Sequence, residues 1–208
     1  ASLESLANAL SGFAFKSKDF IETGEAVIKI KNIKADRSVD IEDTNKVSLQ
    51  VALIAEKYQL NDGDLVIAMT GATVGKFGII VSEEQERYYL NQRVCKLTSH
   101  SKNGNVFLFA ALNKPGFEEG IVDAAQGSAQ PNISASAILA TPMTIPSDEL
   151  INLYISKMTS NYEKRINLKK QEYKLTKLRD TLLPKLISGE LRLPETDSDN
   201  KQTSDTAA

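Results

Sequence analysis

The residues most suggestive of chemistry form a short loop in which two glycines enclose three residues and a lysine follows: Gly71, Ala72, Thr73, Val74, Gly75 and Lys76. Such a loop exposes backbone N–H groups that can bind a phosphate. A nucleotide-hydrolysing phosphate loop needs four residues between its glycines, Ser or Thr after the lysine, and a following helix. Here Phe77 follows the lysine and a strand-like sequence comes next. The pattern disfavours nucleotide hydrolysis, whereas contact with a DNA phosphate and a plain strand connection both stay open.

Other catalytic patterns are poorly supported. Ser–His–Asp chemistry would depend on His100, which lies in a turn-like polar stretch where histidine is usually just solvated. The Glu-x-Lys pattern of nucleases occurs only at 172–174, inside a helix without a nearby carboxylate partner. A single Cys95 and a single His100 exclude a disulfide framework and disfavour a structural zinc site, which needs about four N or S ligands. We therefore expect a chain that is not an enzyme and has no cofactor or metal.

The elements that must position these loops indicate a small α+β domain. β-branched runs predict strands, and helix-forming runs between Gly, Pro or Asn predict short helices. The predicted strands are 26–30, 64–70, 76–81 and 92–98. The predicted helices are 51–58, 105–112, 117–125 and a short turn at 134–139, while 3–10 fits a helix or a first strand. The fold class is α+β: a mixed small β-sheet domain with short helices, followed by one long C-terminal coiled-coil-type helix.

The long helix is predicted from Ser147, which fits an N-cap, to about Leu183–Pro184. Its apolar residues recur at helical spacing and form a seam: Ile151, Ile155, Met158, Tyr162, Leu168, Leu175, Leu178 and Leu182. Such a seam is buried against a second helix, and the chain has no second long amphipathic helix. We therefore expect the seam to be a dimerisation surface, covered by a second copy, another subunit or a missing part of a longer chain.

Charge and composition divide the chain into three regions: a domain at 1–146, a dimerisation or spacer helix at 147–188, and a mostly disordered acidic tail at 189–208. Residues 1–146 carry 14 Lys or Arg against 17 Asp or Glu, residues 147–192 carry 10 against 6, and residues 193–208 carry 1 against 4. The basic helix is typical of a solvated face, or of electrostatic contact with an acidic partner or a phosphate backbone. No apolar stretch approaches the roughly 20 residues that span a bilayer. We also expect no signal peptide before Ala1. We expect a cytoplasmic protein without a membrane partner.

Five motifs in a fixed order resemble a known family. They are 11–20 with 27–33, then 63–76, 90–97, 127–134 and 178–191. The most recognisable is the run GDLVIAMTGATVGK at 63–76. In this order the motifs resemble the specificity (S) subunit of type I restriction–modification systems, over about residues 5–194.

The resemblance implies sequence-specific recognition of double-stranded DNA. S subunits of the family have two recognition domains, each with a long helix; the helices pack antiparallel, and each domain reads half of a split site. This chain has one such unit, so it would be a half-sized subunit that pairs with itself or half of a longer chain. A helix of about 37 residues would be roughly 55 Å long and would set the distance between half-sites. Methylation and cleavage would belong to docked methyltransferase (M) and, in some complexes, restriction/translocase (R) subunits.

Phosphate contacts are expected from cationic residues and the glycine-flanked loop: Lys16, Lys18, Lys31, Thr70, Thr73, Lys76 and Arg93. Base contacts are expected from amide and hydroxyl side chains in loops: Gln92, Gln126, Ser128, Gln130 and Asn132. The alternative is a protein-interaction adaptor with a helical dimerisation arm and no DNA binding, which the acidic domain favours.

Overall fold

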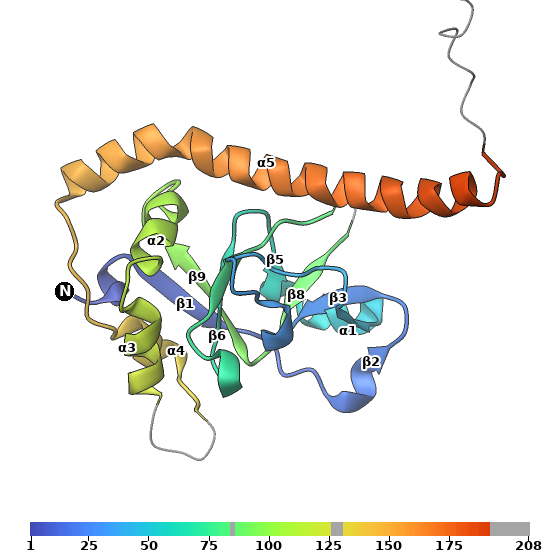
Figure 1. Ribbon diagram of the computed structural model, residues 1–208. Coiled ribbons are helices and arrows are strands. Elements are labelled where there is room, and N and C mark those ends of the chain that lie inside the picture. The colour runs from blue at the N-terminus through green and yellow to red at the C-terminus, as the bar shows by residue number, and fades with distance from the viewer. Residues whose placement is uncertain (84–85, 126–130, 192–208) are drawn as a thin grey trace, which may run out of the picture. The chain divides into compact units, whose positions relative to one another are not determined.

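The computed structural model (Figure 1) describes residues 1–83, 86–125 and 131–191. The chain forms two compact units, Ala1–Lys170 and Gln171–Ala208. The first unit contains all the strands of the described residues, in two small sheets, together with short helices and the first half of a long helix. The predicted α+β class and the long C-terminal helix are confirmed.

The first sheet is antiparallel and has the strand order β1-β9-β6-β7. The strands are β1 (Ala7–Ser11), β9 (Val94–Ser99), β6 (Leu65–Ala68) and β7 (Phe77–Ile79). The hairpin predicted around the glycine-flanked loop is present, since β6 pairs with β7 and Leu65 lies opposite Ile79. Every residue of β6 and β7 is buried, because both faces of this part of the sheet are covered.

The second sheet has the strand order β2-β4-β3-β8-β5. Its strands are β2 (Phe20–Ile21), β4 (Asn45–Val47), β3 (Glu25–Ile28), β8 (Tyr88–Leu90) and β5 (Gln59–Leu60). β3 and β8 are parallel, and the other pairs are antiparallel. Sequence patterning had predicted only β3. The four missed strands have two or three residues each, too few for an alternating pattern to be visible.

The short helices are close to their predicted positions. They are α1 (Leu49–Ile54), α2 (Asn105–Leu112), α3 (Phe117–Ala124) and α4 (Ala135–Leu139). Serine caps begin α1 and α4: Val51 N donates to Ser48 Oγ at 3.4 Å, and Ala137 N donates to Ser134 Oγ at 3.1 Å. The N-terminal segment, which was open between helix and strand, forms a 3-10 turn at Leu3–Ser5 and then β1.

Helix α5 spans Asp148–Ile187, and its start matches the prediction. Ile151 N donates to Ser147 O at 3.0 Å, so Ser147 is the residue that precedes the first turn. The predicted end at Leu183–Pro184 is wrong, because Pro184 lies inside the helix. Proline removes one backbone donor but does not prevent the next hydrogen bond, from Ser188 N to Pro184 O at 2.9 Å.

The first half of α5 packs on its own unit, so the expectation that the whole helix lacks a partner within the chain is wrong. Rings of Phe107 and Tyr154 lie 5.7 Å apart, and rings of Phe109 and Tyr162 lie 6.0 Å apart. Tyr162 Oη donates to Gly63 O at 3.0 Å. The sequence analysis considered only a long helix as a partner. Two aromatic residues of α2, which has eight residues, pack on this part of α5 instead. Figure 1 shows α2 beside the start of α5.

Arg37 ties the 34–40 loop to several parts of the first unit. Its contacts are Asn113 Oδ1 at 3.0 Å, the Glu118 carboxylate, the Phe77 ring at 4.3 Å from the centroid, and Ile79 N, which donates to its carbonyl at 3.0 Å. Arg37 has φ 68°, a value that few non-glycine residues adopt. The neighbouring Asp36 carbonyl accepts a hydrogen bond from Arg165 of α5 at 3.2 Å. We call this group of contacts the Arg37 clasp.

In the second unit, α5 continues from Gln171 with charged and polar residues and exposed leucines. Leu175 is 65% exposed and Leu178 is 54% exposed. The expectation of a disordered tail at 189–208 falls mostly on residues 192–208, which lie outside the described residues.

Candidate nucleic-acid interface

The carboxyl ends of the parallel strands β3 and β8 meet at the same edge of the second sheet. Their register places Ile28 opposite Leu90, and Asn91 N donates to Ile28 O at 3.1 Å. The polar residues that follow the two strands are Lys29 and Lys31 after β3, and Gln92 and Arg93 after β8; we call these four residues the basic edge. They belong to separate stretches of sequence, and the parallel pairing brings the stretches together.

The cations of the basic edge have few counter-charges. Lys29 Nζ lies 3.6 Å from the centroid of the Phe20 ring. Burial, followed by the nearby charges of Lys31 and Arg93, lowers the pKa of Lys29 below its ordinary value. Lys31 Nζ pairs with Asp43 Oδ1 at 2.9 Å, whereas no carboxylate among the described residues pairs with Lys29 or Arg93. An excess of neighbouring positive charge favours binding of an anion.

The glycine-flanked loop begins beside this edge. Met69 N donates to Arg93 O at 3.0 Å, and Ile133 N donates to Met69 O at 2.9 Å. Thr70 and Asn132 form an isolated antiparallel bridge. The exposed Asn132 is thereby held near Arg93, although the two residues are far apart in the sequence.

The threonine hydroxyls of the loop are not available to an external ligand in this conformation. The Oγ1 atoms of Thr70 and Thr73 are buried and have no hydrogen-bond partner among the described residues. Lys76, at the far end of the loop, is half-buried. The strand β7 follows it, which agrees with the sequence argument against a nucleotide-hydrolysing loop.

Lys16 precedes the 3-10 turn Ser17–Asp19 before β2, Lys18 lies within it, and both are exposed. Lys16 N donates to Asp19 Oδ2 at 2.8 Å, which closes the turn. The next residue, Phe20, lies under the ammonium group of Lys29. This contact brings the segment with the two lysines to the basic edge.

The predicted DNA-binding residues therefore divide into three groups. Those that the strand pairings and bridges bring together are Lys31, Thr70, Gln92, Arg93 and Asn132, with Lys16 and Lys18 adjoining through Phe20. Thr73 and Lys76 lie further along the loop, and the Thr73 hydroxyl is buried. Gln126, Ser128 and Gln130 lie outside the described residues. Sequence reasoning missed Lys29, although a second lysine two residues before Lys31, at the end of a predicted strand, was a visible signal.

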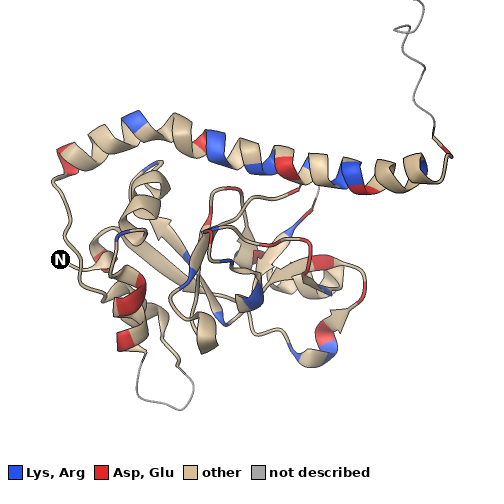
Figure 2. Ribbon diagram, in the orientation of Figure 1, with Lys and Arg blue, Asp and Glu red and all other residues tan. Residues whose placement is uncertain are grey.

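Charge is distributed unevenly over the elements (Figure 2). Red segments gather on α3, which carries Glu118, Glu119 and Asp123. Blue segments recur along α5 and in the lower part of the domain. The face of α3 is thus unsuited to a polyanion, unlike the basic edge.

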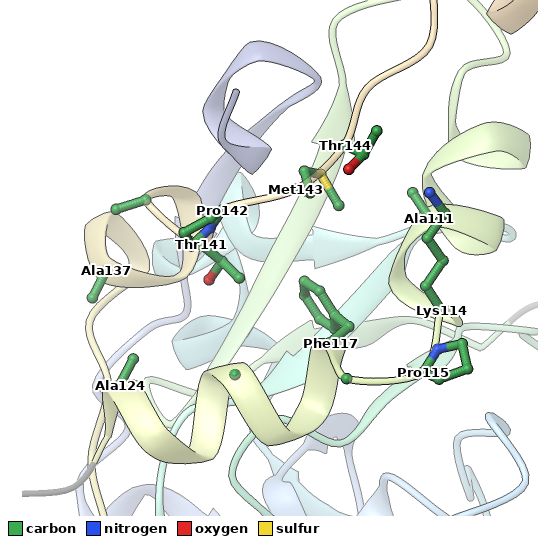
Figure 3. A pocket seen from close by; sticks show the side chains of 13 residues that line it. Ala111, Lys114, Pro115, Phe117, Ala124, Ala137, Thr141, Pro142, Met143 and Thr144 are labelled. Carbon is green, nitrogen blue, oxygen red and sulfur yellow. The ribbon is translucent and has the colours of Figure 1, made fainter.

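A separate cavity of about 530 Å³ lies between the α2–α3 turn, α4 and the segment 140–144. Figure 3 shows Phe117 projecting from the start of α3 toward Met143. Thr141, which also lines it, has a buried hydroxyl without a hydrogen-bond partner among the described residues. None of the described residues predicted to bind DNA lines this cavity, so it is distinct from the basic edge.

The described residues contain no cluster of three or more His, Cys, Asp or Glu side chains suited to a metal ion. Nor does any described helix combine the length and apolar character that a transmembrane span requires.

The predicted dimerisation residues occupy different environments. Ile151 and Ile155 are buried, and Tyr162 is hydrogen-bonded to Gly63 within the first unit. Met158 and Leu182 are partly buried. The exposed members of the seam are Leu168, Leu175 and Leu178. Among the eight predicted seam residues, only these three are exposed.

Residues 1–177 match the family described as the type I restriction modification DNA specificity domain. The chain belongs to this family. The resemblance inferred from the ordered motifs is therefore confirmed.

Two curated relatives are specificity subunits. The HindI specificity subunit from Haemophilus influenzae is 30% identical over 121 residues, which cover 58% of this chain and 26% of the relative. The MjaIX specificity subunit from Methanocaldococcus jannaschii is 39% identical over 75 residues, which cover 36% of this chain and 17% of the relative. The chain thus matches about a quarter or less of each relative. Their names agree with the prediction that the chain is not itself an enzyme.

Solved structures share the fold. The S subunit of a type I restriction-modification system from M. genitalium superposes with a TM-score of 0.56 at 17% identity, covering 91% of this chain and 46% of that chain. The HsdS subunit from Thermoanaerobacter tengcongensis gives a TM-score of 0.52 at 14% identity, covering 92% of this chain and 45% of that chain. This chain spans slightly less than half of each.

Proposed function

We propose that the chain recognises a specific sequence in double-stranded DNA, as the recognition part of a type I restriction–modification complex, and has no catalytic centre of its own. The observation that carries the proposal is the basic edge. Parallel pairing of β3 and β8 gathers three cations and an amide side chain at one place. Family membership supplies the kind of nucleic acid that such an edge would bind.

Within this proposal, one set of side chains contacts phosphates and another contacts base edges. Lys31 and Arg93, together with the adjoining Lys16 and Lys18 and with Lys76 at the far end of the loop, would bind phosphates and set the register of the domain on the duplex. The exposed amides of Gln92 and Asn132 can each form two hydrogen bonds to adenine in the major groove. Gln126, Ser128 and Gln130 stay proposed base contacts on the evidence of sequence alone.

We further propose that one such unit reads one half of a bipartite site. A second recognition unit, supplied by another copy of this chain or by the rest of a longer one, would read the other half. Leu168, Leu175 and Leu178 are exposed on α5, as a helix-to-helix contact requires. Methyltransferase subunits, with or without a restriction/translocase subunit, would dock on this assembly and perform the chemistry.

The direct test is selection of duplexes from a random library by the chain co-purified with its methyltransferase subunit. Wild-type complex should enrich one bipartite motif. Gln92→Ala should relax the preference at one or two positions, at about 1–3 kcal/mol per lost bidentate contact. A pool that stays random after several rounds, with the complex intact, would contradict DNA recognition and support the protein-interaction adaptor.

A further inference from the structure

The lysines after β3 are held by a turn. Residues Ile30–Asn32 form a 3-10 turn that directly follows the strand. Asn32 N donates to Lys29 O at 3.0 Å, and Lys29 N donates back to Asn32 Oδ1 at 2.9 Å. Because both bonds involve the peptide groups of Lys29, the turn fixes the backbone from which its side chain projects.

The Asn32 amide also holds the far end of the same segment. Asn32 is 1% exposed, and its Nδ2 donates to Asp40 O at 3.0 Å and to Asp43 O at 2.9 Å. A single buried side chain therefore joins positions 29, 40 and 43. Displacing this segment would leave a buried amide without its hydrogen-bond partners, which is costly, so the arrangement resists displacement.

The two lysine side chains are placed differently by this turn. Lys29 is steadied by the Phe20 ring, an interaction that leaves its charge unneutralised. Lys31 pairs with Asp43, whose side chain is 74% exposed. An exposed ion pair of this kind contributes little to stability, so a phosphate can replace the carboxylate at little cost.

We propose that Lys29 is a further phosphate-contacting residue of the basic edge, and that Asn32 is the positioning residue that sets the places of Lys29 and Lys31. The inference rests on the proposed recognition of DNA. Its ligand is the phosphodiester backbone of a duplex, so the contribution is independent of base sequence. A lysine with a purely structural role would be expected to pair with a carboxylate, and none of the described residues supplies one to Lys29.

The experiment measures the salt dependence of duplex binding by fluorescence anisotropy. Lys29→Gln should reduce the slope of log K against log salt by about one and weaken all duplexes alike. Asn32→Ala should reduce the slope by about one to two, because both lysines lose their fixed positions. Adding Asn32→Ala to the Lys29→Gln/Lys31→Gln double variant should change the slope no further, which a general loss of structure would not produce.

Matched controls use residues away from the basic edge. Lys102→Gln removes an exposed lysine from the 99–104 turn and should leave the slope unchanged. Asn105→Ala removes another amide that bridges backbone groups, Ser99 N at 3.0 Å and Gly63 O at 3.2 Å. It should lower the melting temperature without changing the slope. Should Asn32→Ala fail to fold, acetylation of wild-type lysines, read by mass spectrometry, should show duplex protection at Lys29 but not at Lys102.

The outcomes separate the two proposals. Absence of duplex binding by wild-type protein in complex with its methyltransferase subunit would overturn the proposed function, and this inference with it. If the wild-type protein binds the duplex, but Lys29→Gln leaves the salt slope unchanged and the duplex does not protect Lys29 from acetylation, the inference alone is overturned. A further slope change on adding Asn32→Ala to the double variant would overturn the positioning role.

Discussion

At the scale of single residues, Lys29 combines partial burial with two neighbouring cations, and both lower its pKa. A bound phosphate would add a negative charge and raise the pKa again. Binding of DNA and protonation of Lys29 therefore favour one another. Affinity is fully present while Lys29 is protonated in the free protein and is lost as pH rises through its lowered pKa.

The first prediction is that duplex affinity at constant ionic strength declines at a lower pH than the loss of charge from an ordinary lysine, whose pKa is about 10.4, would cause. Lys29→Arg should flatten this decline, because the guanidinium stays protonated. Anisotropy titrations at several pH values give the measurement. The same pH dependence for wild type and Lys29→Arg would exclude Lys29 as its source.

The second prediction concerns Lys76, at the end of the glycine-flanked loop. Lys76→Ala should weaken binding to all duplexes alike and reduce the salt slope by about one, since a phosphate contact carries no base preference. Lys114→Ala, at an exposed lysine before α3, is the control. If salt titrations of Lys76→Ala match those of wild type, Lys76 does not contact phosphate.

Candidate residues were visible in the sequence, but their grouping was not. Lys31 and Arg93 were identified by type, whereas their proximity depends on the parallel pairing of β3 with β8. β8 was not predicted, so nothing in the sequence linked positions 29–31 to 92–93. Thr70 and Thr73 were selected because their hydroxyls can bind a phosphate. The structure buries both hydroxyl oxygens, and residue type alone does not reveal this.

At the scale of elements, long or strongly patterned segments were predictable and short strands were not. The β6–β7 hairpin and α2 have enough apolar residues to show their pattern locally. β2 and β5 have two residues each and exist because neighbouring strands offer backbone partners. The sequence analysis did not identify the partner of the first half of α5. That partner is the short helix α2, which contributes two aromatic rings and has no long apolar pattern of its own.

The third prediction tests this packing of α5 on the first unit. Phe109 contacts the rings of Phe77 and Tyr162, and the Arg165 guanidinium lies 5.2 Å from its centroid. Phe109→Ala should lower the free energy of unfolding in urea by about 2 kcal/mol, because a partly buried ring loses its contacts with Phe77 and Tyr162. Tyr162→Phe should cost only about 1 kcal/mol, because Gly63 O keeps its bond from Asn105. Equal effects of the two variants would contradict the assigned packing.

At the scale of the whole molecule, exposed leucines at positions 168, 175 and 178 predict self-association. Leu175→Glu should convert a dimer to a monomer in light scattering, because a charge in an apolar helix seam leaves it unpaired and desolvated. Lys177→Glu is the control and should leave the mass unchanged, because at about 3.6 residues per turn position 177 lies nearly opposite position 175 on the helix. If the wild-type protein is a monomer, or if Leu175→Glu does not affect the dimer, the seam is not a dimer interface.

The single cysteine offers a measure of global stability. Cys95 is fully buried in β9, and burial raises the pKa of its thiol to about 12. It should resist a disulfide reagent in the native protein at neutral pH and react after unfolding in urea, because the thiolate is the nucleophile. Rapid labelling of the folded protein would show that the central strand opens far more often than its burial indicates.

The Arg37 clasp has a consequence for protein engineering. Residues 29–43 carry two cations of the basic edge, yet the same stretch contacts α2, α3, β7 and α5 through Arg37 and Asp36. Grafting this stretch from a relative into this scaffold would import new phosphate-contacting residues and, unless positions 113, 118 and 165 are exchanged too, mismatched anchors. Such chimeras should therefore retain solubility and melting temperature only when graft and anchors come from the same parent.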